Sequence, residues 1–135
     1  MLDWHEQVQT LSREHSQVES RLFLLTDALD EPDDGDTTWR ERTADDILRY
    51  MEIHLLHHMK TEEATVFLYA KTLGLNSVVA ELVVQHQRLR EDLAHLQGNL
   101  IDHWQRTKIK GQQFVALLRD HIAQEETSFF PLIDN

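Results

Sequence analysis

The sequence predicts an all-α protein, an up-down-up-down four-helix bundle, and three observations support this prediction. Apolar residues recur at alternating spacings of three and four along four long segments, which is the pattern of one buried helix face. The chain of 135 residues contains only 4 Gly and 2 Pro, too few for the turns of a many-stranded protein. The segments are joined by short connections, which favours antiparallel neighbours. The length fits one domain, residues 1–135, with one core.

The first helix is predicted from a continuous inward face in which one position is a histidine. The inward positions are Val8, Leu11, His15, Val18, Leu22, Leu25 and Leu29. The acidic stretch after it, residues 30–38, contains a Pro and a Gly and is expected to be an exposed loop. It lacks the spaced ligands and closing Glu of a calcium-binding EF-hand, so we interpret it as a solubilising turn.

The second helix is expected to begin near Thr38, which together with Glu41 resembles a capping box. Gly74 is expected to end this helix, and Asn76 to cap the next one. The predicted inward positions are Ile47, Met51, His54, His58, Glu62, Thr65 and Tyr69. This face therefore contains several polar side chains.

The third and fourth helices repeat the pattern. The third is expected to bury Val79, Leu82, His86, Leu89, Leu93, Leu96 and Leu100. After a short break near Thr107, the fourth is expected to bury Phe114, Leu118, His121, Glu125, Ser128 and Leu132, and Pro131 is expected to end it.

Composition excludes several function classes. The formal net charge of −11 disfavours binding to nucleic-acid phosphates. The absence of Cys excludes disulfides, thiolate metal sites and Cys nucleophiles. The N-terminal residues lack the apolar region of a signal peptide, and no run approaches the roughly 20 apolar residues of a membrane helix. The expected location is the cytoplasm, with neither nucleic acid nor membrane as a partner.

Two similar stretches carry the chemistry: HMKTEE (residues 58–63) and HIAQEE (residues 121–126). Residues four apart on a helix share a face, so the His and first Glu of each motif point inward together. Buried carboxylates require a partner, and no Lys or Arg lies on the inward faces. A divalent metal would turn each group into a ligand.

The chain is internally duplicated, because each half supplies two His and one Glu. The candidate metal ligands are His15, His58, Glu62, His86, His121 and Glu125. This duplication predicts two metal ions, each bound by two His and bridged by the two carboxylates. The alternative is a plain helical bundle whose His residues are structural, but that arrangement would leave two buried carboxylates without partners.

The other histidines fall into two groups. His5, His57, His95 and His103 lie off the inward faces and are expected to be solvated. His54 lies one turn before His58 and is either a fifth imidazole ligand or an outer hydrogen-bond partner; we favour the second. Arg90, one turn after His86, is expected at the rim of the site.

Other metal-site types lack their motifs here. The chain contains no His-Glu-x-x-His, the motif of zincin proteases, and no Glu-x-x-His, the motif of ferritin-type di-iron bundles. Ligands limited to nitrogen and oxygen suit non-haem iron, and also manganese or zinc.

Four stretches, REH (residues 13–15), HMKTEE, QH (residues 85–86) and HIAQEETSFFP (residues 121–131), together resemble hemerythrin and, more closely, the hemerythrin-like HHE cation-binding domains. This resemblance implies a bundle that holds two iron ions with an oxo or hydroxo bridge. It implies that His15 and His58 bind one iron, that His86 and His121 bind the other, and that Glu62 and Glu125 bridge them.

The sequence departs from oxygen-carrying hemerythrin in two respects. Those proteins have a His-x-x-x-His pair on the third helix, whereas Leu82 and Arg90 occupy the flanking positions here. They also close the fourth-helix motif with Asp five residues after His, whereas Glu125 follows His121 by four. The departures favour the relatives linked to nitric oxide, peroxide or iron handling over reversible oxygen carriage.

Two functions remain open at this stage. One is a di-iron protein that binds O2, NO or peroxide, which would make it a candidate oxidoreductase with a redox partner. Leu11, Val18, Leu89 and Leu118 would keep its pocket apolar. The other is a module for iron storage, delivery or sensing without catalytic turnover.

Overall fold

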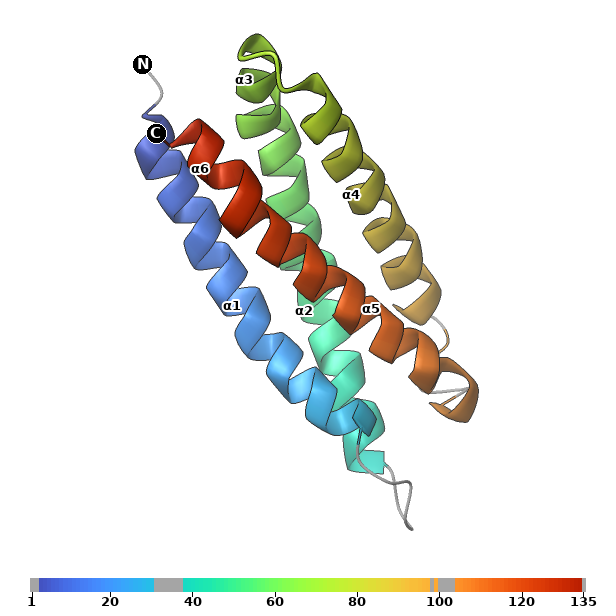
Figure 1. Ribbon diagram of the computed structural model, residues 1–135. Coiled ribbons are helices and arrows are strands. Elements are labelled where there is room, and N and C mark those ends of the chain that lie inside the picture. Colours follow the sequence, from blue (N-terminus) through green and yellow to red (C-terminus); the bar gives the residue numbers. More distant parts are fainter. Residues whose placement is uncertain (1–2, 31–37, 98, 100–103, 135) are drawn as a thin grey trace.

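The computed structural model describes residues 3–30, 38–97, 99 and 104–134, and these residues form an all-α four-helix bundle. Four long helices alternate in direction, as Figure 1 shows: α1 (Trp4–Asp30), α2 (Thr38–Ala64), α4 (Asn76–Gln97) and α5 (Trp104–Gln124). Three short segments extend two of them: α3 (Val66–Thr72) after α2, then the π-helix η1 (Glu125–Phe129) and α6 (Phe130–Ile133) after α5. The predicted fold class is confirmed.

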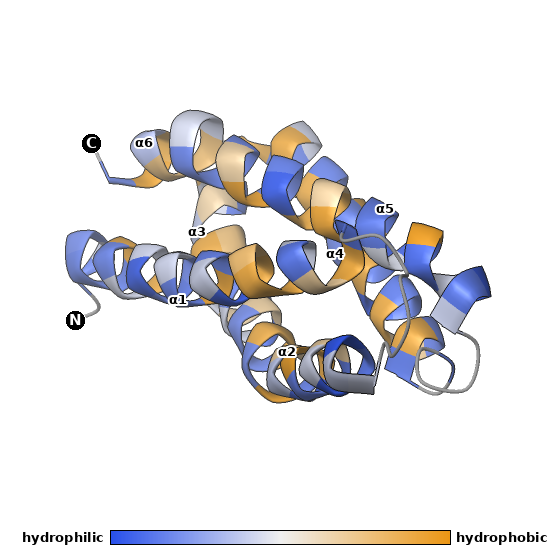
Figure 2. Cartoon of the chain, turned by 90° about the horizontal axis from the view of Figure 1, so that it is seen from below, coloured by the Kyte–Doolittle hydropathy of each residue, from blue (hydrophilic) through white to orange (hydrophobic). Residues whose placement is uncertain are grey.

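The helices close into a ring in which each long helix packs on two others. Helix α1 contacts α2 and α5, and α4 contacts the same two helices from the opposite side. The hydropathy colours alternate along each helix in Figure 2, because only one face of each is apolar. None of the described helices is both long and apolar enough to cross a membrane.

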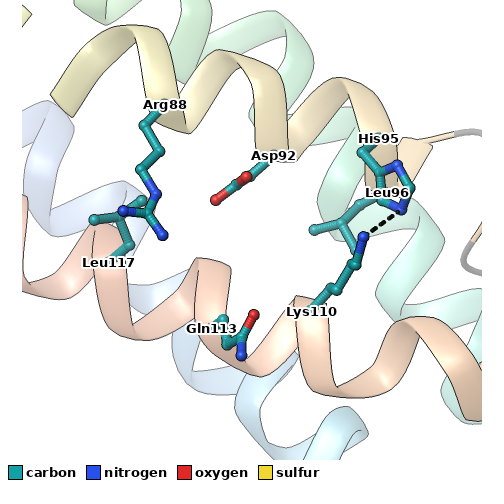
Figure 3. Close-up of a pocket in the computed structure, with 7 residues that line it drawn as sticks. All are labelled: Arg88, Asp92, His95, Leu96, Lys110, Gln113 and Leu117. Carbon is teal, nitrogen blue, oxygen red and sulfur yellow. Dashed lines mark hydrogen bonds between the residues drawn. The ribbon is translucent and has the colours of Figure 1, made fainter. Parts of the chain in front are cut away.

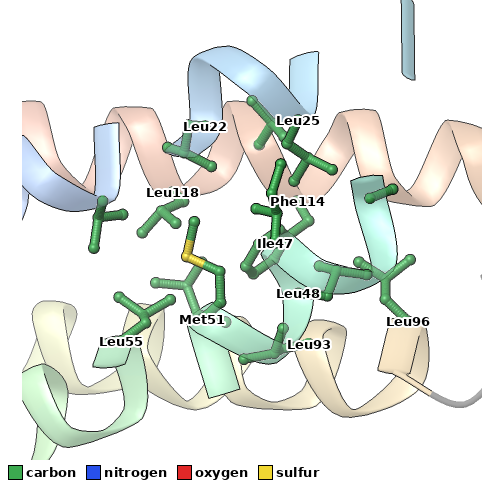
Figure 4. Close-up of a cluster of buried hydrophobic side chains, with 14 of the residues drawn as sticks. Leu22, Leu25, Ile47, Leu48, Met51, Leu55, Leu93, Leu96, Phe114 and Leu118 are labelled. Atoms are coloured by element: carbon green, nitrogen blue, oxygen red, sulfur yellow. The ribbon is translucent and has the colours of Figure 1, made fainter. Parts of the chain in front are cut away.

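Most of the core lies in the half of the bundle away from the chain termini. Figure 4 shows its centre, where Leu22, Met51, Leu93 and Phe114 come from four different helices and point toward one another. A smaller apolar cluster, which includes Leu11, Phe67, Leu82, Phe129 and Phe130, fills the half near the termini. The predicted polar positions fall between these two clusters.

Phe114→Ala is expected to lower the free energy of unfolding by about 3–5 kcal/mol, because it removes a fully buried ring from a packed core. Chemical denaturation of the metal-free protein measures this change. Phe23→Ala is the matched control, since the Phe23 side chain on α1 is 64% exposed and its loss should cost little. Similar losses in both variants would contradict this core assignment.

Several predicted boundaries are confirmed. Helix α2 begins at Thr38 and α4 begins at Asn76. Gly74 adopts the positive φ of 81° that favours glycine in a turn, but it follows α3, because α2 itself already ends at Ala64. Two others are wrong. Thr107 lies inside α5, where it is buried, and Pro131 occupies the first turn of α6, where a helix tolerates proline. Most of the predicted acidic loop, together with Leu100 and His103, lies outside the described residues.

The inward face shifts by one position after each motif glutamate. The sequence predicts that Thr65, Tyr69, Ser128 and Leu132 face the core, but none of them is buried. The buried residues are instead Val66, Phe67, Ala70, Phe129, Phe130 and Ile133. Both helices therefore change register directly after the candidate ligands.

The cause is a backbone irregularity in each helix. At Thr65 the backbone leaves the α conformation (φ −125°, ψ −89°), and its amide donates to the Glu62 carbonyl at 3.2 Å instead of continuing the α pattern. The Thr65 hydroxyl also donates to the Thr61 carbonyl at 2.7 Å, which competes with backbone pairing. In the second motif, the wider π turn of η1 begins at Glu125 and adds the extra residue.

Candidate metal centre

The six predicted ligands lie together in the middle of the bundle, between the two apolar clusters. His15 comes from α1, His58 and Glu62 from α2, His86 from α4, His121 from α5, and Glu125 from the first position of η1. Each is at most 3% exposed. Four helices therefore deliver six buried polar side chains to one place.

The six residues form two groups that share both carboxylates. One group is His15, His58, Glu62 and Glu125, and the other is Glu62, His86, His121 and Glu125; within each, one ligand atom per residue lies within 4.8 Å of all the others. The arrangement matches the internal duplication of the sequence. It could hold two ions with the carboxylates between them.

Each carboxylate reaches one histidine from each half. Glu62 Oε1 lies 3.0 Å from His58 Nε2 and 3.4 Å from His86 Nε2. Glu125 Oε1 lies 3.1 Å from His15 Nε2 and 3.2 Å from His121 Nε2. Ligand atoms bound at about 2.1 Å and at right angles to each other are about 3 Å apart, so these separations suit common ligands of one ion.

The outer nitrogens of the four imidazoles are held by hydrogen bonds across the helices. His15 Nδ1 donates to Glu126 at 2.8 Å, and His58 Nδ1 donates to Glu14 at 2.7 Å. In the other half, His86 Nδ1 donates to Glu63 at 2.8 Å and His121 Nδ1 donates to Gln85 at 2.6 Å. Because carboxylate and amide oxygens only accept, each Nδ1 carries the proton, and in a neutral ring Nε2 presents its lone pair inward.

These four partners are functional residues that the sequence reasoning missed. A signal was present: the second Glu of each motif supplies Glu63 and Glu126, and the residue before each remaining histidine supplies Glu14 and Gln85. Arg90 lies at the rim as predicted, where it donates to Glu63 Oε1 at 2.8 Å.

Several inward atoms lack protein hydrogen-bond partners. Among the described residues, His58 Nε2, both Glu62 oxygens and Glu125 Oε2 are buried without one; His58 Nε2 and Glu62 Oε1 are close, but they are not aligned for a hydrogen bond. His86 Nε2 and His121 Nε2 lie 3.1 Å apart, so two lone pairs face each other when both rings are neutral and protonated at Nδ1. Such an arrangement is costly without a cation. The donor set therefore fits a metal.

The electrostatics of the two glutamates lead to the same conclusion. Burial, followed by the charge of Glu125, raises the pKa of Glu62 well above its usual value. Burial also opposes ionisation of Glu125, but the neighbouring side chains of Glu62, His121 and His15 outweigh it and leave the pKa of Glu125 lowered. Without metal, the pair retains one proton between two buried carboxyls. A dication would remove the need for that proton.

Burial also controls the imidazoles. It lowers the pKa of His86 to about 4, with the charge of His121 acting in the same direction, and it lowers the pKa of His58. At His15 burial is outweighed by Glu125 and Glu126, so its pKa is raised. Two of these histidines are therefore held in the neutral form that binds metals.

Aromatic rings cover the side of the site that faces the termini. Phe67 stacks on His86 at 5.1 Å between ring centroids, and Phe130 stacks on His15 at 5.4 Å. Each Phe follows its motif glutamate by five residues, so the register shift places equivalent rings over equivalent ligands. These contacts fix the ring planes and keep that side apolar.

The expected role of His54 as an outer partner is wrong. The side chain is exposed, and its ring packs over Tyr50 at 4.3 Å between centroids, away from the ligands. His5, His57 and His95 are exposed, as predicted.

A surface pocket of about 260 Å³ lies between α4 and α5, as Figure 3 shows. Its lining includes none of the six candidate ligands, and within it Lys110 Nζ lies 3.3 Å from His95 Nε2. This pocket is therefore separate from the candidate metal centre.

Comparison with known proteins agrees with the geometry. The family model described as hemerythrin HHE cation binding domain matches residues 6–133, nearly the whole chain. No curated protein and no solved structure matches the chain. With the match extending over all four helices and both motifs, the chain belongs to the hemerythrin HHE cation-binding family.

Proposed function

We propose that this protein holds a pair of non-haem iron ions and binds a small ligand, O2, NO or peroxide, beside them. The ions would lie between His15 and His58 and between His86 and His121, with Glu62 and Glu125 contributing to both. An iron pair supplies exchangeable electrons and coordination positions for a small ligand. The protein contributes the neutral imidazoles, the two carboxylates and an apolar enclosure.

The observation that carries this proposal is the set of buried inward atoms without hydrogen-bond partners. Three carboxylate oxygens and one imidazole nitrogen are enclosed without a hydrogen-bond partner, and the Nε2 atoms of His86 and His121 face each other at 3.1 Å. Folding would not retain so many unpaired groups without compensation. Metal ions compensate all of them at once.

The surroundings favour a small ligand and a resident ion. Leu11, Val18, Leu89 and Leu118, each about one turn from a histidine ligand, are at most 2% exposed. An enclosed apolar setting suits a diatomic molecule or peroxide better than a larger substrate. Because the ligands are equally enclosed, exchange of an iron cargo would require the bundle to open, so storage or delivery is the less favoured function.

Metal analysis of aerobically purified protein tests the proposal. We expect close to two iron ions per chain and a near-ultraviolet absorption band that weakens on chemical reduction. His15→Ala should lower the iron content, whereas His57→Ala, which changes an exposed histidine on α2, should leave it unchanged. A colourless, metal-free protein from iron-replete cells would contradict the proposal.

A further inference from the structure

The two halves of the centre differ in the groups that support their histidines. Chain symmetry pairs Glu14 with Gln85, since each precedes a ligand histidine and each accepts the Nδ1 proton of a histidine on the next long helix. It likewise pairs Glu126 with Glu63, since each follows a motif glutamate. The first pair is not equivalent, because Glu14 is a carboxylate and Gln85 is a neutral amide.

The neutral partner is fixed in its orientation. Gln85 Nε2 donates to Gln124 Oε1 at 2.9 Å, which leaves Gln85 Oε1 to accept from His121. On the other side, the Glu14 carboxylate accepts a hydrogen bond from His58 Nδ1 at 2.7 Å. His58 is therefore supported by a full negative charge, and His121 by an amide dipole.

The second pair is not equivalent either. Glu63 accepts a hydrogen bond from Arg90, so its charge is balanced within the protein. Glu126 Oε2 accepts from the neutral Ser12 hydroxyl at 3.0 Å. Among the described residues, the two carboxylates of the His15 and His58 half form no ion pair with a Lys or Arg. The outer groups of the His86 and His121 half, Gln85, Glu63 and Arg90, have no net charge.

We propose that the two metal positions are unequal, and that the position between His15 and His58 binds the first ion. A carboxylate that accepts the Nδ1 proton makes the imidazole a stronger donor at Nε2, and a neutral amide does so less. Two carboxylates also attract a cation more strongly than a balanced pair does. Glu14 and Gln85 set the difference as positioning residues. This inference rests on the proposed metal pair.

Titration of the metal-free protein with Zn²⁺, a redox-inert probe, tests the order of binding by calorimetry. We expect two steps whose affinities differ by about 10-fold or more, the usual effect of an outer hydrogen-bond partner. Gln85→Glu should tighten the weaker step, and Glu14→Gln should weaken the tighter step. Both variants should therefore reduce the difference in Zn²⁺ affinity between the two steps, Gln85→Glu by strengthening the weaker step and Glu14→Gln by weakening the tighter one.

Cadmium NMR on the same variants assigns each step to a position. In the native protein one resonance should appear first and a second should follow. Glu14→Gln should shift the first resonance, and Gln85→Glu the second. Gln87→Glu is the control, because it adds the same charge to α4 on an exposed side chain two residues away.

The possible results separate this inference from the proposed function. Failure to bind Zn²⁺ at all would overturn both. If two ions bind in one step and Gln85→Glu behaves like Gln87→Glu, the proposed metal pair remains supported. The proposal that the two metal positions have unequal affinities would then be wrong. Thermal melts of each metal-free variant verify that the bundle remains folded.

Discussion

Glu62→Ala and Glu125→Ala are each expected to lose both metal ions rather than one. Each carboxylate lies within 3.4 Å of a histidine from each half, so its removal takes a ligand from both positions. It also removes one of the two negative charges nearest the ions. The two variants should resemble each other because the halves are related by the internal duplication. Metal content after purification measures the result.

The controls for this experiment come from α2 itself. His54→Ala and Glu52→Ala change exposed side chains near the same helix turn and should retain the metal content of the native protein. The metal-free glutamate variants should remain folded, because each removes a buried carboxyl without a protein hydrogen-bond partner on at least one oxygen. Two ions retained in Glu62→Ala, or an emptied site in His54→Ala, would overturn the arrangement described for α2.

The sequence predicts the bundle and the positions of the six polar residues because both depend on spacing within one helix. Alternating steps of three and four identify an inward face, and His58 with Glu62 simply continues that face. Spacing fails where the helix is not ideal. After Glu62 and Glu125 the backbone gains one residue, and the predicted positions Thr65 and Ser128 rotate away from the core.

Residue spacing within one helix does not predict which side chains of two different helices meet. Glu14 supports His58 from another helix, and the relative height of two helices is not encoded in the periodicity of either one. The error at His54 has a simpler cause. At about 100° per residue, His58 and Leu55 lie within about 40° of the buried Met51, whereas His54 lies about 60° away, at the edge of the inward face.

Removing the metal is expected to lower the melting temperature by about 10 °C or more. An ion that binds only the folded chain, and whose free concentration is about 100 times its Kd, adds nearly 3 kcal/mol to the free energy of unfolding. The difference in melting temperature between the metal-bound and the metal-free protein should increase as the pH rises from about 6.5 to about 8. Thermal melts with and without chelator, with metal loss verified, measure the gap at each pH.

The widening follows from the direction of each pKa shift. Glu62 and His15 have folded-state pKa values raised above their unfolded values, so the stability they give the metal-free bundle is lost as the pH rises toward and through those folded values. Each such group contributes at most about 1.4 kcal/mol per pH unit. His86, His58 and Glu125 have lowered pKa values, so their contributions are complete above the unfolded value and stay constant in this window.

The metal-bound bundle should not share this loss, because its ligands are already deprotonated and protons compete less for them as the pH rises. Metal-free Glu62→Ala provides the internal check: without the Glu62 carboxyl, its melting temperature should fall less over the same pH window than that of the metal-free native chain. A gap that narrows between about pH 6.5 and pH 8 would contradict the assignment of Glu62 as the carboxyl that takes up a proton when the metal leaves.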